Sequence, residues 1–176
     1  MLFNYFYIMK KTSYHVIGVM SGTSLDGIDM AACFFEISEG QKWSFKIGVS
    51  QTIEYPTIWK RTLQEAVHYP EEKLKELNEN YTDYLSQVIS AFISKHKIAA
   101  IDAVCSHGHT ILHEPEKGIT LQIGNLPKLA KLINQKVVCD FRVQDVKLGG
   151  QGAPLVPIGD KLLFSEHGYC LNLGGF

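Results

Sequence analysis

The chain has 176 residues, of which 45% are hydrophobic and 20% are charged, and its formal net charge is -1. This length and apolar content suffice for a single domain with a normal core. The near-neutral charge leaves no electrostatic footprint for nucleic acid or for a membrane surface, and the lack of a long uncharged apolar run predicts no transmembrane helix.

The first elements are predicted to be three consecutive antiparallel strands. Residues 14–20 are apolar and β-branched, residues 28–37 form their hairpin partner, and residues 43–53 alternate apolar and polar side chains. Two helices follow. Residues 56–69 start with a proline, and residues 71–95 carry an apolar stripe at three- and four-residue spacing.

The second part of the chain alternates short strands and helices. Strands are predicted at residues 99–106, 136–140 and 169–173, and helices at residues 126–134 and 155–165. On pattern alone, this order indicates a mixed α/β fold.

A polar loop between the first two strands is a candidate phosphate site. Gly22 and Gly27 allow its backbone to take positive φ or to lie close to a ligand. Hydroxyl groups come from Ser21, Thr23 and Ser24. Successive backbone N–H groups in such a turn can form an anion-binding nest. An ordinary hairpin turn is the alternative, because Asp-Gly alone is a common hairpin signal. No Gly-Lys-Ser/Thr follows, so the loop is not a Walker P-loop.

Three histidines and four cysteines invite a metal interpretation. His107 and His109 are alternate residues of a strand and could chelate from one side, with His113 nearby. No carboxylate or thiol completes such a set, so we disfavour it. The cysteines show no metal-ligand spacing, and we expect buried, reduced thiols, as in a cytoplasmic protein. They are Cys33, Cys105, Cys139 and Cys170.

Residues 18–29 read GVMSGTSLDGID and closely resemble the signature of anhydro-N-acetylmuramic acid kinases, which belong to the actin-like, hexokinase-like ATPase superfamily. The resemblance covers essentially everything from residue 14 onward. Further blocks follow in the family's order, at residues 106–115, 121–125, 140–142, 148–157 and 171–176.

The resemblance implies an α/β actin-like ATPase (ribonuclease H-like) lobe, with a central mixed sheet, three antiparallel strands first, and helices on both faces. Residues 14–168 would form this first lobe, and residues 169–176 the first strand of a truncated second lobe. Residues 1–13 would be a tail or a misassigned start, with Met9 as an alternative to Met1. Their apolar part is too short for a signal peptide and no basic region precedes it.

ATP and Mg2+ are the cofactors that the resemblance implies. Asp26 is the candidate metal ligand and the one candidate catalytic residue, because apolar Met20 stands where many superfamily members carry an aspartate. For Asp29, local hydrogen bonding in the hairpin is the alternative. The residues implied to contact the phosphates of ATP are Gly22, Thr23, Ser24, Leu25, Asp26, Gly27, Ile28 and Asp29.

Anhydro-N-acetylmuramic acid is the implied substrate. Arg142 offers a planar fork for its lactyl carboxylate, and a salt bridge to Asp140 or Asp145 is the alternative. Asn125 could instead cap a helix, His107 could be structural, and the loop at residues 149–154 could be a tight turn. The family usually has glutamine where this chain has His109. The implied substrate residues are His107, Gln122, Asn125, Arg142, Gln151 and Gly152.

The family reaction opens the 1,6-anhydro ring with water and phosphorylates O6, in peptidoglycan recycling. Its general base is an aspartate in a Phe-Asp-x-Gly-Pro-Gly-Asn segment, which does not occur in these 176 residues and would lie beyond Phe176. We therefore expect this chain to be inactive alone, and a separately encoded C-terminal lobe is a candidate partner. The alternatives are a non-enzymatic sugar-binding remnant, one half of a split kinase, and a kinase for another small sugar.

Overall fold

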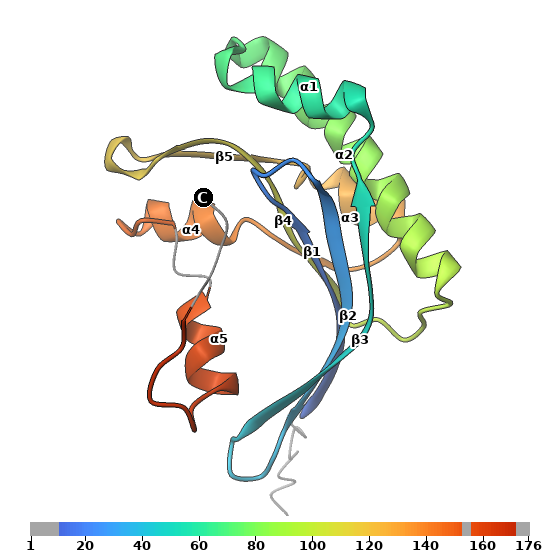
Figure 1. Cartoon of the computed structure of the whole chain (residues 1–176), viewed down its shortest axis with the longest axis vertical. Helices are drawn as coiled ribbons and strands as arrows, with labels where there is room; N and C mark the ends of the chain where they lie inside the picture. Colours follow the sequence, from blue (N-terminus) through green and yellow to red (C-terminus); the bar gives the residue numbers. More distant parts are fainter. Residues whose placement is uncertain (1–10, 153–155, 172–176) are drawn as a thin grey trace, which may run out of the picture.

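Within residues 11–152 and 156–171, which the computed structural model of the chain describes, six strands form one mixed sheet in the order β3-β2-β1-β4-β5, with β6 beside β4 (Figure 1). Neighbouring strands run antiparallel, except that β1 and β6 run parallel to β4. The strands are β1 Ser13–Ser21, β2 Gly27–Ile37, β3 Trp43–Glu54, β4 Ala103–Glu114, β5 Ile119–Ile123 and β6 Val137–Val138.

The three antiparallel strands expected at the start are confirmed, and their bounds differ from the prediction by a residue at most. Gly27 is required where β2 begins. A Cβ atom there would lie 2.5 Å from the carbonyl oxygen of Ile53 on β3, which is closer than atoms can pack. The tight start of β2 therefore depends on a residue without a side chain.

Helices cover both faces of the sheet, as expected (Figure 1). On one side lie α1, its 3-10 continuation η1, α2 and α3, and on the other lie α4 and α5. None of the described helices is both long enough and apolar enough to span a membrane. The helices are α1 Thr57–Glu65, η1 Ala66–His68, α2 Glu71–Lys95, η2 Pro115–Lys117, α3 Lys128–Ile133, α4 Phe141–Lys147 and α5 Val156–Leu163.

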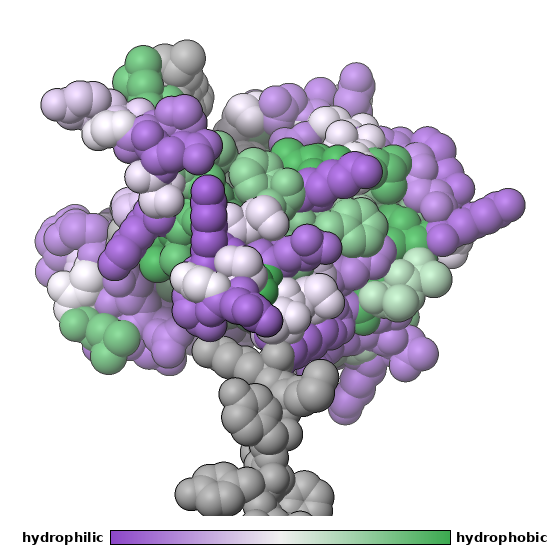
Figure 2. Space-filling view, turned by 90° about the horizontal axis from the view of Figure 1, so that it is seen from below, coloured by the Kyte–Doolittle hydropathy of each residue, from purple (hydrophilic) through white to green (hydrophobic). Residues whose placement is uncertain are grey.

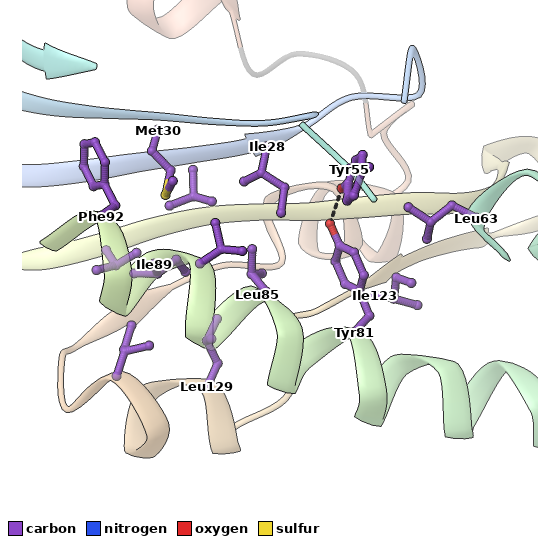
Figure 3. Packing of buried hydrophobic residues seen from close by; sticks show 14 of the residues in the cluster. Ile28, Met30, Tyr55, Leu63, Tyr81, Leu85, Ile89, Phe92, Ile123 and Leu129 are labelled. Atoms are coloured by element: carbon purple, nitrogen blue, oxygen red, sulfur yellow. Dashed lines mark hydrogen bonds between the residues drawn. The ribbon is translucent and has the colours of Figure 1, made fainter. Parts of the chain in front are cut away.

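The hydrophobic core lies between the sheet and α2 (Figure 3). The apolar stripe of α2 packs on the side chains that β1 and β2 point toward it, because alternate residues of a strand share a face. Fully buried members of this core include Ile17, Ile28, Tyr81, Leu85, Ile89 and Leu129.

The strand predicted at residues 99–106 is wrong at both ends. It begins at Ala103, because the backbone of Ala100 is left-handed (φ 54°) and Asp102 accepts a hydrogen bond from the backbone N–H of His15. It continues to Glu114, because β4 changes partner and pairs with β5 after leaving β1. His107 therefore lies within a strand and not after its end.

The strand predicted at residues 169–173, as the start of a second lobe, is not formed in the part that the structure describes. Residues 169–171 have no regular secondary structure, and Tyr169 is 98% exposed, because no neighbouring strand pairs with this segment. The rest of the segment, residues 172–176 with Phe176 as its last residue, lies outside the described residues. The general base expected beyond Phe176 is not among the described residues either, so the division into two lobes stays a prediction.

Two further differences concern short elements and one thiol. Two short elements, β5 and α4, were not predicted, although β5 alternates apolar and polar residues as a strand does; α4 has only seven residues and no helical period. Cys170 is exposed, contrary to the expectation of buried thiols, because it belongs to the segment without strand pairing. The other three cysteines are partly buried.

Candidate functional site

The loop that follows β1 is fastened at its start by a buried hydrogen-bond network. Ser21, the last residue of β1, is buried, and its Oγ lies 2.9 Å from Nδ1 of His109 on β4. The hydroxyl of Tyr81, on α2, donates to the same Oγ at 2.9 Å. Tyr55, just after β3, adds contacts with the hydroxyls of Ser21 and Tyr81, and Figure 3 shows the second of these.

The network has four contacts and four protons when His109 carries its proton on Nδ1. This nitrogen then donates to Ser21, Ser21 donates to Tyr55, and Tyr55 donates to Tyr81. Tyr81 closes the ring by donating back to Ser21. Each buried hydroxyl thus donates one hydrogen bond and accepts at least one, which offsets the cost of burying it.

Burial keeps this network uncharged. Loss of solvation lowers the pKa of His109 to about 4, with a smaller contribution from His107, so the imidazole is neutral at pH 7. Burial also raises the pKa of Tyr55, and it raises the pKa of Tyr81 well above its ordinary value. The phenols therefore stay protonated, and the network places no negative charge beside the loop.

The backbone of the loop bends at Leu25, which adopts a left-handed conformation with φ 58° and donates its N–H to the carbonyl of Gly22 at 3.3 Å. Such a conformation costs on the order of 1 kcal/mol for a residue with a side chain. Packing of the Leu25 side chain against the core offsets this cost. In the described part of the chain, the N–H groups of Thr23 and Ser24 have no backbone partner, so an anion could accept both.

Asp26 is the exposed carboxylate of this loop. Its Oδ1 accepts hydrogen bonds from the Ser24 hydroxyl at 2.7 Å and from the Gly27 N–H at 3.0 Å. These bonds, above all the one from Ser24, lower the pKa of Asp26. An ionised carboxylate whose second oxygen is free fits Mg2+, which keeps several waters and takes few protein carboxylates.

The remaining two loop residues of the prediction point to opposite faces of β2. Ile28 is fully buried in the core, so only its backbone borders the loop. Asp29 lies on the other face, where its Oδ1 accepts a hydrogen bond from Thr52 Oγ1 at 2.5 Å. The partner of Asp29 is thus on β3 and not within the hairpin of β1 and β2, where the sequence analysis expected local bonding as the alternative.

Three of the implied substrate residues lie together where β4 and α4 approach each other. Nε of Arg142 donates to Nε2 of His107 at 2.9 Å. Nδ2 of Asn125 donates to the carbonyl of His107 at 3.2 Å, and its Oδ1 accepts from Ser106 Oγ at 3.0 Å. The structure therefore joins residues that are up to 35 positions apart in the chain.

Two of the alternative interpretations are wrong. Asn125 does not cap a helix, because α3 begins at Lys128 with Pro127 as its N-cap residue. Arg142 forms no ion pair with Asp140 or Asp145 in the described residues, and its Nε is bound to His107 instead.

The tautomer of His107 follows from its neighbours. Its Nδ1 lies 2.9 Å from the carbonyl oxygen of Gly108, which can only accept, so Nε2 presents a lone pair to Arg142. Burial, and secondarily the charge of Arg142, lowers the pKa of His107. Among the described residues, the two terminal nitrogens of Arg142 have no hydrogen-bond partner, which leaves a fork suited to a carboxylate.

The other implied substrate residues make no hydrogen bond to this cluster in the described residues. Gln122 is buried on β5, where its Nε2 donates to Thr120 Oγ1 at 2.8 Å, and its Oε1 has no partner within residues 11–152 and 156–171. Gly152 donates its N–H to Asp145 at 2.7 Å, so this group is not available to a ligand. Gln151 is exposed.

His107 and His109 do not project to the same side, contrary to the geometry that chelation would need. Gly108 between them is left-handed (φ 71°), and the pairing of β4 with β1 shifts at this point. His107 therefore turns to Arg142, and His109 turns to Ser21. In the part of the chain that the structure describes, no three His, Cys, Asp or Glu side chains come together as metal ligands.

A cavity of about 880 Å³ lies on the face of the sheet opposite α2. Of the residues predicted to bind ligands, only Asp29 and His107 line it. Its other lining residues are Gly18, Val19, Met20, Met30, Ala31, Ser50, Gln51, Thr52, Cys105, Phe141 and Ile158.

The strand order, the antiparallel start and the fastened loop after β1 define an α/β lobe of the actin-like ATPase type. A family profile described as "Anhydro-N-acetylmuramic acid kinase" matches residues 14–176. The chain belongs to the anhydro-N-acetylmuramic acid kinase family.

Curated relatives share this family description. An anhydro-N-acetylmuramic acid kinase of Pseudomonas fluorescens is 39% identical over 168 residues, which cover 91% of this chain and 45% of the relative. The kinase of Pseudomonas putida is 40% identical over 167 residues, which cover 91% of this chain and 45% of the relative. The kinase of Bradyrhizobium diazoefficiens is 39% identical over 158 residues, which cover 84% of this chain and 42% of the relative. The chain thus spans slightly less than half the length of these relatives.

Sequence reasoning missed the residues that fasten the loop. Tyr81 lies within the helix predicted at residues 71–95, and Tyr55 lies just after the strand predicted at residues 43–53, but neither pattern indicates a polar role for these side chains. One signal was available: Ser21 has the same strand parity as buried Ile17 and Val19, so a polar group at the end of that face needed partners in the core.

Proposed function

We propose that this chain is the phosphate- and sugar-binding lobe of an ATP-dependent anhydro-N-acetylmuramic acid kinase. The kinase would open the 1,6-anhydro ring with water and phosphorylate O6, in the recycling of cell-wall amino sugars in the cytoplasm. The observation that carries this proposal is the loop after β1, with unpaired N–H groups at Thr23 and Ser24 among the described residues and a fixed start at Ser21.

The roles of the loop residues follow from their chemistry. Thr23 and Ser24 would donate backbone N–H groups to phosphate oxygens, and the carboxylate of Asp26 would hold Mg2+, directly or through water. When bound, Mg2+ would neutralise charge on the transferring phosphoryl group. Ser21 would not touch the nucleotide, because its hydroxyl is buried in the network with His109.

The cluster around Arg142 supports the sugar half of the proposal. The guanidinium is held through Nε by His107, which orients its two terminal nitrogens and leaves their hydrogen bonds for a ligand. They would bind the lactyl carboxylate that distinguishes muramic acid from other amino sugars.

Nucleotide binding tests the phosphate site. Calorimetry of the chain with Mg-ATP should show binding that Asp26→Asn weakens about tenfold or more, because the variant loses a charge at the metal position. Ser38→Ala, in the turn before β3, is a matched control outside the site and should leave the affinity unchanged. Equal affinities for all three proteins, or no binding by a folded chain, would contradict the phosphate role.

Sugar selectivity tests the second site. The chain should bind anhydro-N-acetylmuramic acid more tightly than the corresponding sugar without the lactyl group, and Arg142→Leu should abolish this preference. Arg61→Leu, which changes an exposed arginine of α1, is the control. An unchanged preference in the Arg142 variant would favour the alternative of a kinase for a different small sugar.

Catalysis by these 176 residues alone is not part of the proposal, because the family's general-base segment does not occur in them and would lie beyond Phe176. A separately supplied C-terminal lobe would complete the enzyme, as one half of a split kinase. A non-enzymatic sugar-binding remnant is the second candidate, and the complete cluster of His107, Asn125 and Arg142 favours it. Phosphate transfer to anhydro-N-acetylmuramic acid by the purified chain alone would contradict both.

A further inference from the structure

The face of the sheet opposite α2 carries an apolar groove that no described element fills. The groove is the cavity of about 880 Å³, and its floor is a row of small side chains from three adjacent strands. Gly18 on β1 lies directly beside Ala31 on β2 and beside Cys105 on β4. A Cβ atom added to Gly18 would meet one atom only, at 4.0 Å, so the floor is open above the backbone.

Apolar side chains border this floor and reach the surface. Met20 of β1 is 43% exposed, and Ile158 of α5, which also lines the groove, is 58% exposed. Seen from below, Figure 2 shows apolar residues at the surface between polar ones. Exposed apolar area that is gathered in one groove is typical of a contact surface.

Two polar side chains of the groove are already engaged. Asp29 accepts a hydrogen bond from Thr52, and His107 accepts one from Arg142. The side chain of Gln51 turns to the other face of the sheet, where it bonds to Lys95 of α2 and to His96 just after this helix. Most of what the groove still offers is therefore apolar contact, which suits a polypeptide surface better than a sugar with many hydroxyl groups.

The topology also favours a cover on this side. β1 and β4 pair in parallel at the centre of this mixed sheet, and strands paired in parallel are typically covered on both faces by helices. Here α2 covers one face, whereas α4 and α5 reach only the margin of the other (Figure 1). A row of small residues would let a helix approach the sheet closely.

The part of the family's proteins that this chain does not match could fill the groove. The matched region is 45% of the Pseudomonas fluorescens relative, so more than half of that protein has no counterpart in these 176 residues. We propose that the groove is the docking surface for an apolar helix face from that unmatched half of the family's proteins. The inference rests on the proposed function only in taking this chain as one lobe of a larger kinase.

Thiol reactivity offers a direct test, because Cys105 lies in the floor of the groove. Alkylation of Cys105 is measured by mass spectrometry in this chain and compared with a cysteine at the aligned position of the complete Pseudomonas fluorescens relative. The cysteine in the complete relative should react at least about tenfold more slowly, because reaction then requires local opening. A cysteine replacing Val67, on η1 at the other face, is the control and should react equally in both proteins.

Equal reactivity at the Cys105 position in the two proteins would overturn the proposal. So would protection of Cys105 in this chain by anhydro-N-acetylmuramic acid, which would make the groove a sugar site. Protection that grows with the concentration of this chain would overturn it as well, because a second copy would then be the occupant.

A charge in the groove gives an independent measurement that does not depend on labelling. Ile158→Glu should leave the melting temperature of this chain within about 2 °C, since the side chain is exposed. The aligned substitution in the complete relative should lower the melting temperature by about 5 °C or more, because it would bury a carboxylate against apolar surface. Equal shifts in the two proteins would contradict docking at the groove.

Ligand binding by Ile158→Glu separates this inference from the proposed function. Ile158, on α5, belongs to neither proposed ligand site, so the variant should bind Mg-ATP and the sugar as the unaltered chain does. A chain that binds neither ligand, combined with a protected cysteine in the complete relative, would reject the proposed function and keep the docking surface.

Discussion

The same strands place different kinds of side chain on the two faces of the sheet. Along β1, Ile17 and Val19 point into the core with α2, whereas Gly18 and Met20 point into the groove. The first face is filled by large apolar side chains, and its polar groups are paired in one network. The second has a floor of small side chains. One face therefore supplies stability, and the other supplies an unfilled surface, from a single alternating sequence.

The largest expected effect is the difference in the free energy of unfolding between substitutions on the two faces. Leu85→Ala, at a fully buried position of α2, should lower the free energy of unfolding by about 2–5 kcal/mol, because it leaves a cavity in the packed core. Met20→Ala on the groove face should change it by about 0.5 kcal/mol or less. Urea denaturation of both variants measures the difference, and comparable losses would mean that the two faces are equally packed.

Acid should weaken the closed face through His109. Its pKa is about 4 in the folded chain, below the ordinary 6.5, so the unfolded chain takes up the proton first. The free energy of unfolding should therefore fall as the pH drops from about 6.5 to about 4, by up to about 3 kcal/mol for this residue. Protonation of His107, whose pKa is also lowered, acts in the same direction.

Denaturation curves at several pH values test this dependence. His109→Gln keeps an N–H donor for Ser21 without a titrating ring, so its stability should decline less steeply over this range. His113→Gln, at an exposed position, serves as the control. A slope in His109→Gln as steep as in the unaltered chain would show that His109 is not the residue responsible.

A smaller loss should follow from removing one hydroxyl of the network. Tyr81→Phe leaves Tyr55 without an acceptor and removes one of the two hydrogen bonds that Ser21 accepts, which should cost about 1–3 kcal/mol of stability. Tyr84→Phe is a matched control on the same helix, because in the described residues the Tyr84 hydroxyl has no hydrogen bond. Calorimetric melting compares the two, and an equal effect would show that the ring of bonds does not stabilise the fold.

The smallest effect lies on the groove side. Arg142→Gln removes a positive charge beside His107, so the pKa of His107 should rise while staying below its ordinary value, because burial is the larger cause of its lowering. A titration followed by NMR measures the shift, with Arg61→Gln as the control. A His107 pKa that falls or does not move would contradict the contact between the two side chains.

Local pattern was sufficient for the regular parts of the fold. Helix α2 was predicted with the bounds that it has, Glu71–Lys95, because its apolar stripe is long and regular. The first three strands followed from alternation in the same way. The extension of β4 could not be predicted, because it depends on the left-handed Gly108 and on a change of partner strand, and neither leaves a periodic signal.

The candidate site was predictable as a set of residues but not as an arrangement. Motifs pointed to the loop and to His107, Asn125 and Arg142, and their ligand roles stay predictions. The bond from Arg142 to His107 could not be read from spacing, which favoured nearby Asp140 or Asp145 as partners. Such contacts depend on how β4 and α4 come together, and a single sequence does not contain that information directly.

The bond between Ser21 and His109 also has a kinetic consequence. The two residues are 88 positions apart, whereas the β1–β3 meander and α2 form from contacts between neighbours in the chain. Closing so long a segment costs entropy before the pairing of β1 with β4 repays it, so this step should come late in folding. During synthesis, the loop after β1 emerges early and gains its bond to His109 only when β4 has left the ribosome.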